Sequence, residues 1–310
     1  MDFSWTEEQT ALRERVRDLL ARELPPDWAR LSRHGPGSPE QTAFSLNFCP
    51  KLAEAGLLVP HWPVEHGGRG APPWHHFIIG EERFAREGLA LAATAGQLAR
   101  TAADAAPQPV KVAGSLPPLF GSYRPDLFQP ERVADLLTPL LQGLAPHVDL
   151  WLAETQSSIV EARAIHAGLP KDGKPFWLSF TLKDEDTDEV PRLRSGEPVA
   201  EAAAVAAELG VETLLFNCSQ PEVIGAAIDA ARDTFERLGV KINIGAYANA
   251  FPPQPKEATA NDGLDPLRED LDPPGYLHWA IDWQQRGASH LGGCCGIGPE
   301  HIAVLAQKLG

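Results

Sequence analysis

Two adjacent cysteines stand between glycines near the end of the sequence, in the segment HLGGCCGIGP, residues 290–299. The chain of 310 residues contains only four cysteines, so half of them lie side by side, at Cys294 and Cys295. A disulfide between neighbouring cysteines would strain the peptide bond that joins them. Two adjacent thiolates can instead bind one metal ion if the backbone turns sharply, and glycine permits such a turn. The segment therefore indicates metal or thiolate chemistry.

A third cysteine, Cys218, ends the apolar segment VETLLFNCS, residues 211–219, which predicts a β-strand. The paired cysteines also end a predicted strand, residues 288–296. Because the carboxyl ends of the strands of a parallel barrel meet at one rim, we expect the three thiolates to converge. Three thiolates leave one position of tetrahedral Zn²⁺ open for a substrate, and soft ligands favour zinc over magnesium. The alternative is that Cys218 is a small core residue and that the pair is inert.

The elements that must position these cysteines alternate regularly from residue 109 onward. Apolar segments alternate with amphipathic ones, which is typical of an α/β fold with a parallel sheet covered by helices. The predicted strands cover residues 109–117, 148–155, 174–182, 211–219, 241–251 and 288–296. The helices that follow them cover residues 130–147, 157–169, 198–210, 221–239, 276–287 and 299–310. Six such units favour a (β/α) TIM-type barrel, but eight strands are needed to close one, so we predict an incomplete barrel.

The first part of the chain has a different pattern. Apolar residues recur at helical spacing over residues 5–24, 44–55 and about 80–105, and segments rich in proline and glycine separate these stretches. We therefore predict two domains, a helical segment over residues 1–78 and a barrel over residues 79–310.

Charge and composition limit the partners. The formal net charge of −15 argues against nucleic acid and anionic membranes, because like charges repel. No apolar run approaches the ~20 residues that span a bilayer, and the acidic, amphipathic beginning of the chain is unlike a secretion signal. We expect small-molecule substrates and a cytoplasmic protein, and we make no prediction of the oligomeric state.

Several separated motifs agree with one known family. VAGSLPPLFGSY, LAET, SFTLKD, SGEP, FNCS, YANAF and GGCCG follow the order found in the homocysteine S-methyltransferase family, which the chain resembles over about residues 79–310. The resemblance implies a zinc-dependent barrel enzyme whose metal ligands are Cys218, Cys294 and Cys295. It also implies that polar side chains line an amino-acid pocket, namely Glu154, Asn217, Ser115, Tyr247 and Asn249.

The reaction implied by this resemblance moves a methyl group from a sulfonium donor, S-methylmethionine or S-adenosylmethionine, to the thiol of homocysteine. The product is methionine, so the role would be in methionine biosynthesis. Zinc with three thiolates carries a net charge of about −1, so a bound thiol loses its proton yet stays electron-rich. Glu154 would bind the substrate ammonium group, and the alternative is that it pairs with a lysine or arginine. The sequence separates neither the donors nor homocysteine from selenocysteine.

The beginning of the chain departs from that family. The family's first strand carries an Asp-Gly-Gly-Met-like turn and its second ends in a Thr-Asn-Ser-Tyr-like motif, and neither occurs here. Residues 1–74 instead resemble the N-terminal helical region of acyl-CoA dehydrogenases. The chain therefore looks like a fusion whose barrel lacks its first two strands. Two other functions stay open: a non-catalytic zinc-binding fusion protein with a truncated barrel, and an acyl-CoA-binding module in residues 1–74.

The missing strands should leave the two edges of the sheet exposed, which invites pairing with another chain. Either the segment GLLVPHW, residues 56–62, forms a surrogate strand, or helices or a partner subunit cover these edges. We expect the six units to stay barrel-like, with the N-terminal helices packed against the opening.

Overall fold

The computed structural model describes residues 6–26, 28, 39–60, 64–66, 69, 73–184, 190–253 and 266–310, with the side chains of residues 41 and 73–83 left aside. The chain divides into two compact units, Met1–Leu98 and Ala99–Gly310.

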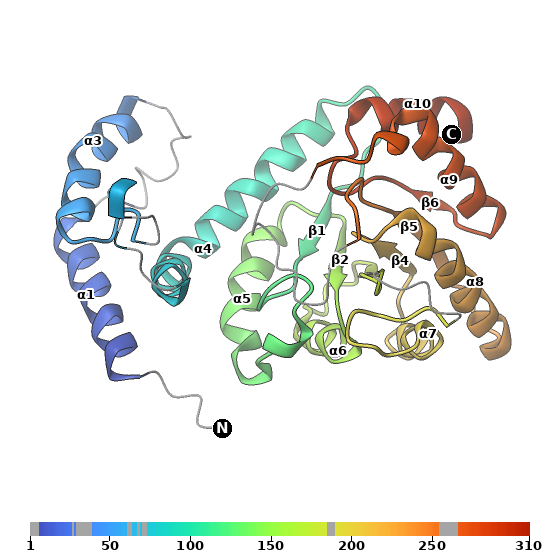
Figure 1. Ribbon diagram of the computed structural model, residues 1–310, viewed down its shortest axis with the longest axis horizontal. Coiled ribbons are helices and arrows are strands. Elements are labelled where there is room, and N and C mark those ends of the chain that lie inside the picture. The colour runs from blue at the N-terminus through green and yellow to red at the C-terminus, as the bar shows by residue number, and fades with distance from the viewer. Residues whose placement is uncertain are drawn as a thin grey trace. The chain divides into compact units, whose positions relative to one another are not determined.

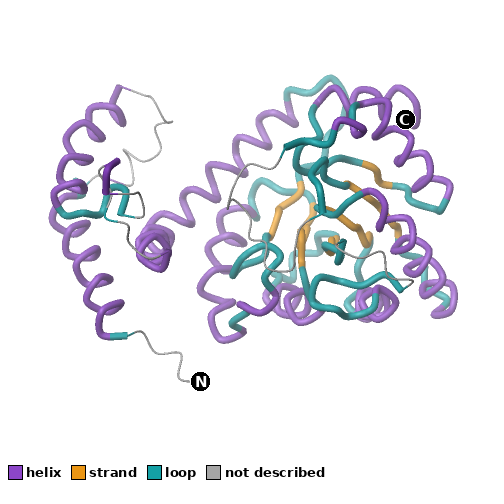
Figure 2. Tube along the Cα trace, in the orientation of Figure 1, coloured by secondary structure: helices purple, strands orange, loops and turns teal. Residues whose placement is uncertain are grey.

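The second unit is built on a parallel six-stranded sheet in which each strand pairs with the next along the chain (Figures 1 and 2). The strands are β1 (Ala113–Leu116), β2 (Leu150–Gln156), β3 (Phe176–Phe180), β4 (Thr213–Asn217), β5 (Asn243–Tyr247) and β6 (His290–Leu291). The helices lie around the sheet and are α5 (Val133–Leu144), α6 (Ile159–Gly168), α7 (Val199–Glu208), α8 (Pro221–Leu238), α9 (Pro273–Gln285) and α10 (Pro299–Leu309). Short 3₁₀ turns occur at Pro125–Leu127, Pro130–Arg132 and Glu269–Leu271. The predicted α/β fold with six strand and helix units is confirmed.

The sheet curves into a barrel that does not close. Trp177 on β3 and His290 on β6 meet edge to face, with ring centroids 4.8 Å apart, although two strands lie between them. Among the described residues no strand joins β6 to β1, so the incomplete barrel that we predicted is confirmed. Gly56–Pro60 of the proposed surrogate segment contains no strand, and the rest of that segment lies outside the described residues. The expectation that the N-terminal helices cover the opening stays a prediction.

The two faces of the sheet differ because only one of them is covered by helices. Outward side chains such as Leu178, Phe180, Leu214 and Phe216 are fully buried in the main hydrophobic core. On the inner face Ser115 is exposed and Glu154 is half-buried, whereas Ser179 and Asn217 are fully buried. In a closed barrel such inner side chains fill packed layers. The inner face is therefore accessible at Ser115 on β1 and closed at β3 and β4.

The first unit is helical and contains α1 (Glu7–Glu23), α3 (Pro39–Glu54), a 3₁₀ turn at Val64–His66 and the larger part of α4 (Pro73–Asp104). Thr6 begins α1, because its hydroxyl accepts from the Gln9 amide while the Gln9 side chain accepts from the Thr6 amide. A small core fixes α1 against the segment after α3, and its buried members are Leu12, Val16, Leu19 and Leu57. The predicted domain boundary at residues 78 and 79 lies inside α4 and stays a prediction.

Among the described residues, no helix combines the length and the apolar character needed to cross a bilayer.

Candidate metal and substrate site

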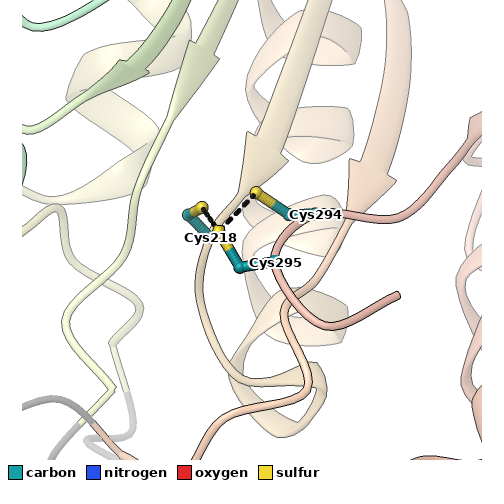
Figure 3. Close-up of side chains that lie close together, drawn as sticks. All are labelled: Cys218, Cys294 and Cys295. Atoms are coloured by element: carbon teal, nitrogen blue, oxygen red, sulfur yellow. Dashed lines mark hydrogen bonds between the residues drawn. The ribbon is translucent and has the colours of Figure 1, made fainter. Parts of the chain in front are cut away.

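The three cysteine side chains converge at one rim of the sheet. Cys218 directly follows β4, and Cys294 and Cys295 lie in the loop after β6 (Figure 3). The Cys295 sulfur lies 3.9 Å from the sulfur of Cys218 and 3.9 Å from that of Cys294, and all three sulfurs are within 4.8 Å of one another. Tetrahedral zinc with Zn–S bonds of about 2.3 Å separates its thiolates by ~3.8 Å. The three side chains therefore fit a single metal ion with one position left open.

Backbone hydrogen bonds hold the two cysteine loops together. The Cys218 amide donates to the Tyr247 carbonyl at 3.4 Å, and the Cys294 amide donates to the Ala248 carbonyl at 2.9 Å. Cys218 itself has φ of 50°, a left-handed conformation that residues other than glycine seldom adopt. Gly296 has φ of 80° and makes the turn after the pair, where a Cβ atom would lie 2.6 Å from Leu267. The glycine that the sequence places beside the pair is thus required by the turn.

The three thiols influence one another strongly. Hydrogen bonds from Cys218 and Cys294 lower the pKa of Cys295, the exposed member of the cluster. Hydrogen bonding to Cys218 and Cys295, together with burial, raises the pKa of Cys294. Without a metal the cluster therefore favours one thiolate stabilised by two protonated neighbours. A bound metal ion would displace these protons, so metal binding at this cluster must depend on pH.

Asn217 is fully buried beside the cysteines, at the end of β4. Its amide oxygen accepts from the Ser179 hydroxyl at 2.6 Å, and its amide nitrogen donates to the Thr155 hydroxyl at 2.8 Å. The same nitrogen lies 3.9 Å from the Cys294 sulfur. Asn217 therefore ties β2, β3 and the cysteine loop together at the rim.

Three of the expected pocket residues form a second cluster on the inner face. Glu154 accepts from the Ser115 hydroxyl at 2.7 Å on one carboxylate oxygen and from the Tyr247 hydroxyl at 3.1 Å on the other. Burial raises the pKa of Tyr247 well above its usual value, so the phenol stays protonated and donates. Tyr247 pairs with Asn217 in the register of β4 and β5, so this carboxylate lies at the same rim as the cysteines. Glu154 is half-buried and has acceptor capacity left for a cationic group.

Asn249, the fifth expected pocket residue, bonds to the loop after β5. Its side chain is buried, and its amide oxygen accepts from the Phe251 backbone amide at 3.3 Å. Its own backbone amide donates to the Ser219 carbonyl at 3.1 Å. These contacts shape the loop next to Cys218 rather than extend the carboxylate cluster.

Sequence reasoning did not select Tyr123 or Tyr276, although both lie at the site. Burial raises the pKa of Tyr123, and the neighbouring Cys218 thiol raises it further. The Tyr276 hydroxyl donates to the carbonyl of Gly292 at 2.8 Å, just before the paired cysteines. The composition held a signal for these residues. The chain has only three tyrosines, Tyr123, Tyr247 and Tyr276, and all of them lie near this rim.

Comparisons with known protein families agree with the architecture of both units. The model of the homocysteine S-methyltransferase family matches residues 76–309. The model of the acyl-CoA dehydrogenase N-terminal domain matches residues 6–105, so the two matches overlap within and just after α4. The fusion-like arrangement that we predicted is thereby confirmed.

Individual relatives are more distant. Homocysteine S-methyltransferase 4 of Zea mays is 28% identical over 174 residues, which are 55% of this chain and 46% of the relative. Selenocysteine Se-methyltransferase of Brassica oleracea var. italica is 30% identical over 190 residues, which are 59% of this chain and 50% of the relative. The chain thus spans about half the length of these curated relatives.

Solved structures show the same fold. The homocysteine methyltransferase MmuM from Escherichia coli, in its oxidized form, is 25% identical with a TM-score of 0.56, and the match covers 74% of this chain and 75% of that one. Its apo form matches with a TM-score of 0.53 over 72% of this chain and 75% of that one. With a family model that covers most of its length and includes the cysteine cluster, the chain belongs to the homocysteine S-methyltransferase family.

Proposed function

We propose that this chain is a zinc-dependent methyltransferase that moves a methyl group from a sulfonium donor, S-methylmethionine or S-adenosylmethionine, to the thiol of homocysteine. The observation that carries the proposal is the convergence of three cysteine sulfurs, with two separations of 3.9 Å, at the rim that also holds Glu154. Thiolates in this arrangement suit Zn²⁺ better than harder cations.

Cys218, Cys294 and Cys295 would hold the zinc ion. When bound there, zinc supplies a substrate thiolate at neutral pH, because a metal ion lowers the pKa of a thiol that coordinates it. The negative charge of three protein thiolates keeps that sulfur electron-rich. The burial of Cys218 and its left-handed backbone conformation would fix this ligand before the substrate arrives.

Glu154 is suited to bind the ammonium group of the amino acid. Ser115 and Tyr247 each donate to one of its oxygens, so the carboxylate is held in a single orientation. Transfer of a methyl group from a cationic sulfonium to an anionic thiolate neutralises both charges. A site with little water therefore favours the reaction, and Asn217, which is fully buried at the rim, helps to keep water out.

The second candidate function is a non-catalytic zinc-binding protein. It is favoured by the opening between β6 and β1 in the described structure and by the exposure of Ser115 on the inner face. A closed barrel would bury that side chain and shield the substrate from water. The two functions share the metal site and differ only in whether methyl transfer occurs.

The test is methionine formation by the full chain, reduced and loaded with Zn²⁺, with homocysteine and either donor. Cys218→Ser removes one ligand, and Cys49→Ser is the matched control because Cys49 lies on α3 outside the cluster. We expect methionine from the wild type and from Cys49→Ser but none from Cys218→Ser. Zinc binding by the wild type without methionine from either donor would contradict the enzymatic proposal and favour the non-catalytic one. A parallel reaction with selenocysteine tests the acceptor.

A further inference from the structure

A single buried hydroxyl contacts the backbone next to the paired cysteines. Tyr276, on α9, is fully buried, and its hydroxyl donates to the Gly292 carbonyl at 2.8 Å and to the Ala248 carbonyl at 3.4 Å. Ala248 directly follows β5 and Gly292 directly follows β6, so the hydroxyl joins the two strands just beyond their last paired residues. A phenylalanine would fill the same space without the cost of burying a polar group. The hydroxyl therefore needs an explanation in the backbone that it contacts.

That backbone fixes the positions of both cysteines. The Ala248 carbonyl also accepts from the Cys294 amide at 2.9 Å. The Cys295 carbonyl accepts from the Ala250 amide at 2.9 Å, so both cysteines are bonded to the segment after β5. Gly292 lies only two residues before Cys294 in the loop after β6. One hydroxyl thus contacts both backbone segments that determine where the paired thiols lie.

The ring of Tyr276 is itself held by aromatic neighbours. Trp283 and His301 meet it edge to face, with ring centroids 5.7 Å and 5.9 Å away. His301 lies on α10, which packs against α9 (Figure 1). The imidazole is fixed in turn, since its Nδ1 accepts from the Gly298 amide at 3.1 Å and its Nε2 lies 3.0 Å from the Leu271 carbonyl. These contacts fix the direction of the Tyr276 hydroxyl.

The cysteine loop needs such a restraint because its own sequence supplies little. Three of the five residues 292–296 are glycine, the residue that restricts the backbone least. Zinc with Zn–S bonds of about 2.3 Å requires sulfur separations of ~3.8 Å, and the Cys295 sulfur lies 3.9 Å from those of Cys218 and Cys294. When only a fraction of the molecules holds the binding arrangement, the apparent affinity for a metal falls in proportion to that fraction.

We propose that Tyr276 is a positioning residue: its hydroxyl holds the glycine-rich loop so that Cys294 and Cys295 stay at metal-binding distance from Cys218. It acts through the two backbone carbonyls that it contacts. This inference rests on the proposed metal site and adds a residue of α9 that prepares the site for the metal.

The test compares Tyr276→Phe with the wild type, both as full reduced chains, because this substitution keeps the ring and removes only the hydroxyl. The first readout uses no metal and is hydrogen–deuterium exchange of the peptide that contains the Cys294 amide, measured by mass spectrometry. We expect this peptide to exchange about fivefold faster in Tyr276→Phe, the change that loss of one ordinary hydrogen bond produces. Ser289→Ala is the matched control. The Ser289 hydroxyl also donates to a carbonyl of β5, that of Ile244 at 3.4 Å, but it lies just before β6, at the end of the strand away from the cysteines. Exchange of the cysteine peptide in this variant should equal that of the wild type.

The second readout is the binding of Co²⁺ alone, followed by its visible absorption. Tyr276→Phe should bind Co²⁺ about fivefold more weakly than the wild type, in proportion to the smaller fraction of binding-competent loops, and Ser289→Ala should bind it equally well. Urea unfolding of the same proteins separates positioning from mere structure, since a hydroxyl that only stabilises the fold would lower the unfolding midpoint and leave Co²⁺ affinity unchanged.

Unchanged Co²⁺ affinity in Tyr276→Phe, with or without faster exchange of the loop, would overturn the inference and leave the proposed function intact. A wild type that binds no Co²⁺ would overturn both.

Discussion

Replacing Glu154 by glutamine removes a negative charge from the rim while keeping the shape of the side chain. The carboxylate accepts from Ser115 at 2.7 Å and from Tyr247 at 3.1 Å, and an amide can bond to the same hydroxyls because these also accept. The fold should therefore survive. What is lost is the charge that would bind a substrate ammonium. A hydrogen bond to a charged group contributes about 1.5–3 kcal/mol, so homocysteine should bind about 10- to 150-fold more weakly.

The assay is calorimetric titration of the zinc-loaded protein with two thiols. Homocysteine carries the ammonium group, and 4-mercaptobutyrate has the same thiol and carboxylate without it. Glu154→Gln should weaken only homocysteine. Ser115→Ala removes a hydrogen bond that orients Glu154 but keeps its charge, so it should weaken homocysteine less than Glu154→Gln does. The comparison isolates the contact between Glu154 and the ammonium group. An equal loss for both thiols, or no loss for homocysteine, would refute the assigned role of Glu154.

Two further predictions concern the scaffold. Asn217→Ala should lower the free energy of unfolding by about 2–4 kcal/mol, because the Ser179 and Thr155 hydroxyls lose their buried partner. Urea unfolding measures this loss. Asn243→Ala, at an exposed position at the start of β5, is the control, and an equal loss in that variant would contradict the prediction. Asp149 accepts from the Val112 amide at 2.7 Å and from Arg100 at 2.5 Å, and these contacts lower its pKa below the ordinary value of 3.8. Its stabilising effect is therefore present above about pH 4 and disappears as the pH falls through the folded-state pKa. The difference in urea midpoint between the wild type and Asp149→Asn should shrink from pH 7 to pH 3. A difference that stays constant over this range would contradict the prediction.

The architecture of the barrel follows from local sequence patterns. Apolar strands, amphipathic helices and their order lie in contiguous segments, so periodicity alone predicts six units and an incomplete barrel. The strands are shorter than predicted, and β6 has two residues instead of nine. After Leu291 the glycines turn the chain toward Cys218, so the pairing of β6 with β5 ends there. The predicted strands also included polar residues of the rim, such as Asn249, which lie in the loops after the strands.

The site was partly predictable. Cys218 and the paired cysteines are found because strand ends in a parallel barrel share one rim, and that topology is readable from the sequence. Tyr123 and Tyr276 could not be found in this way, since they lie in the loop after β1 and on α9 and approach the rim only in the folded chain. Asn249 has the expected residue type at the expected strand end, yet its side chain bonds to the adjacent backbone. Residue type and strand position do not fix the direction of a side chain in a loop.

The central claim is that three cysteine sulfurs bind one zinc ion with a position left for a substrate thiol. Its most direct test is zinc content, measured by plasma mass spectrometry on the reduced full chain, together with zinc-edge X-ray absorption before and after homocysteine is added. We predict about one zinc per chain with three sulfur ligands at ~2.3 Å, a fourth sulfur when homocysteine is present, and loss of the metal in Cys218→Ser. Protein without zinc, or zinc that Cys218→Ser retains unchanged, would contradict the account.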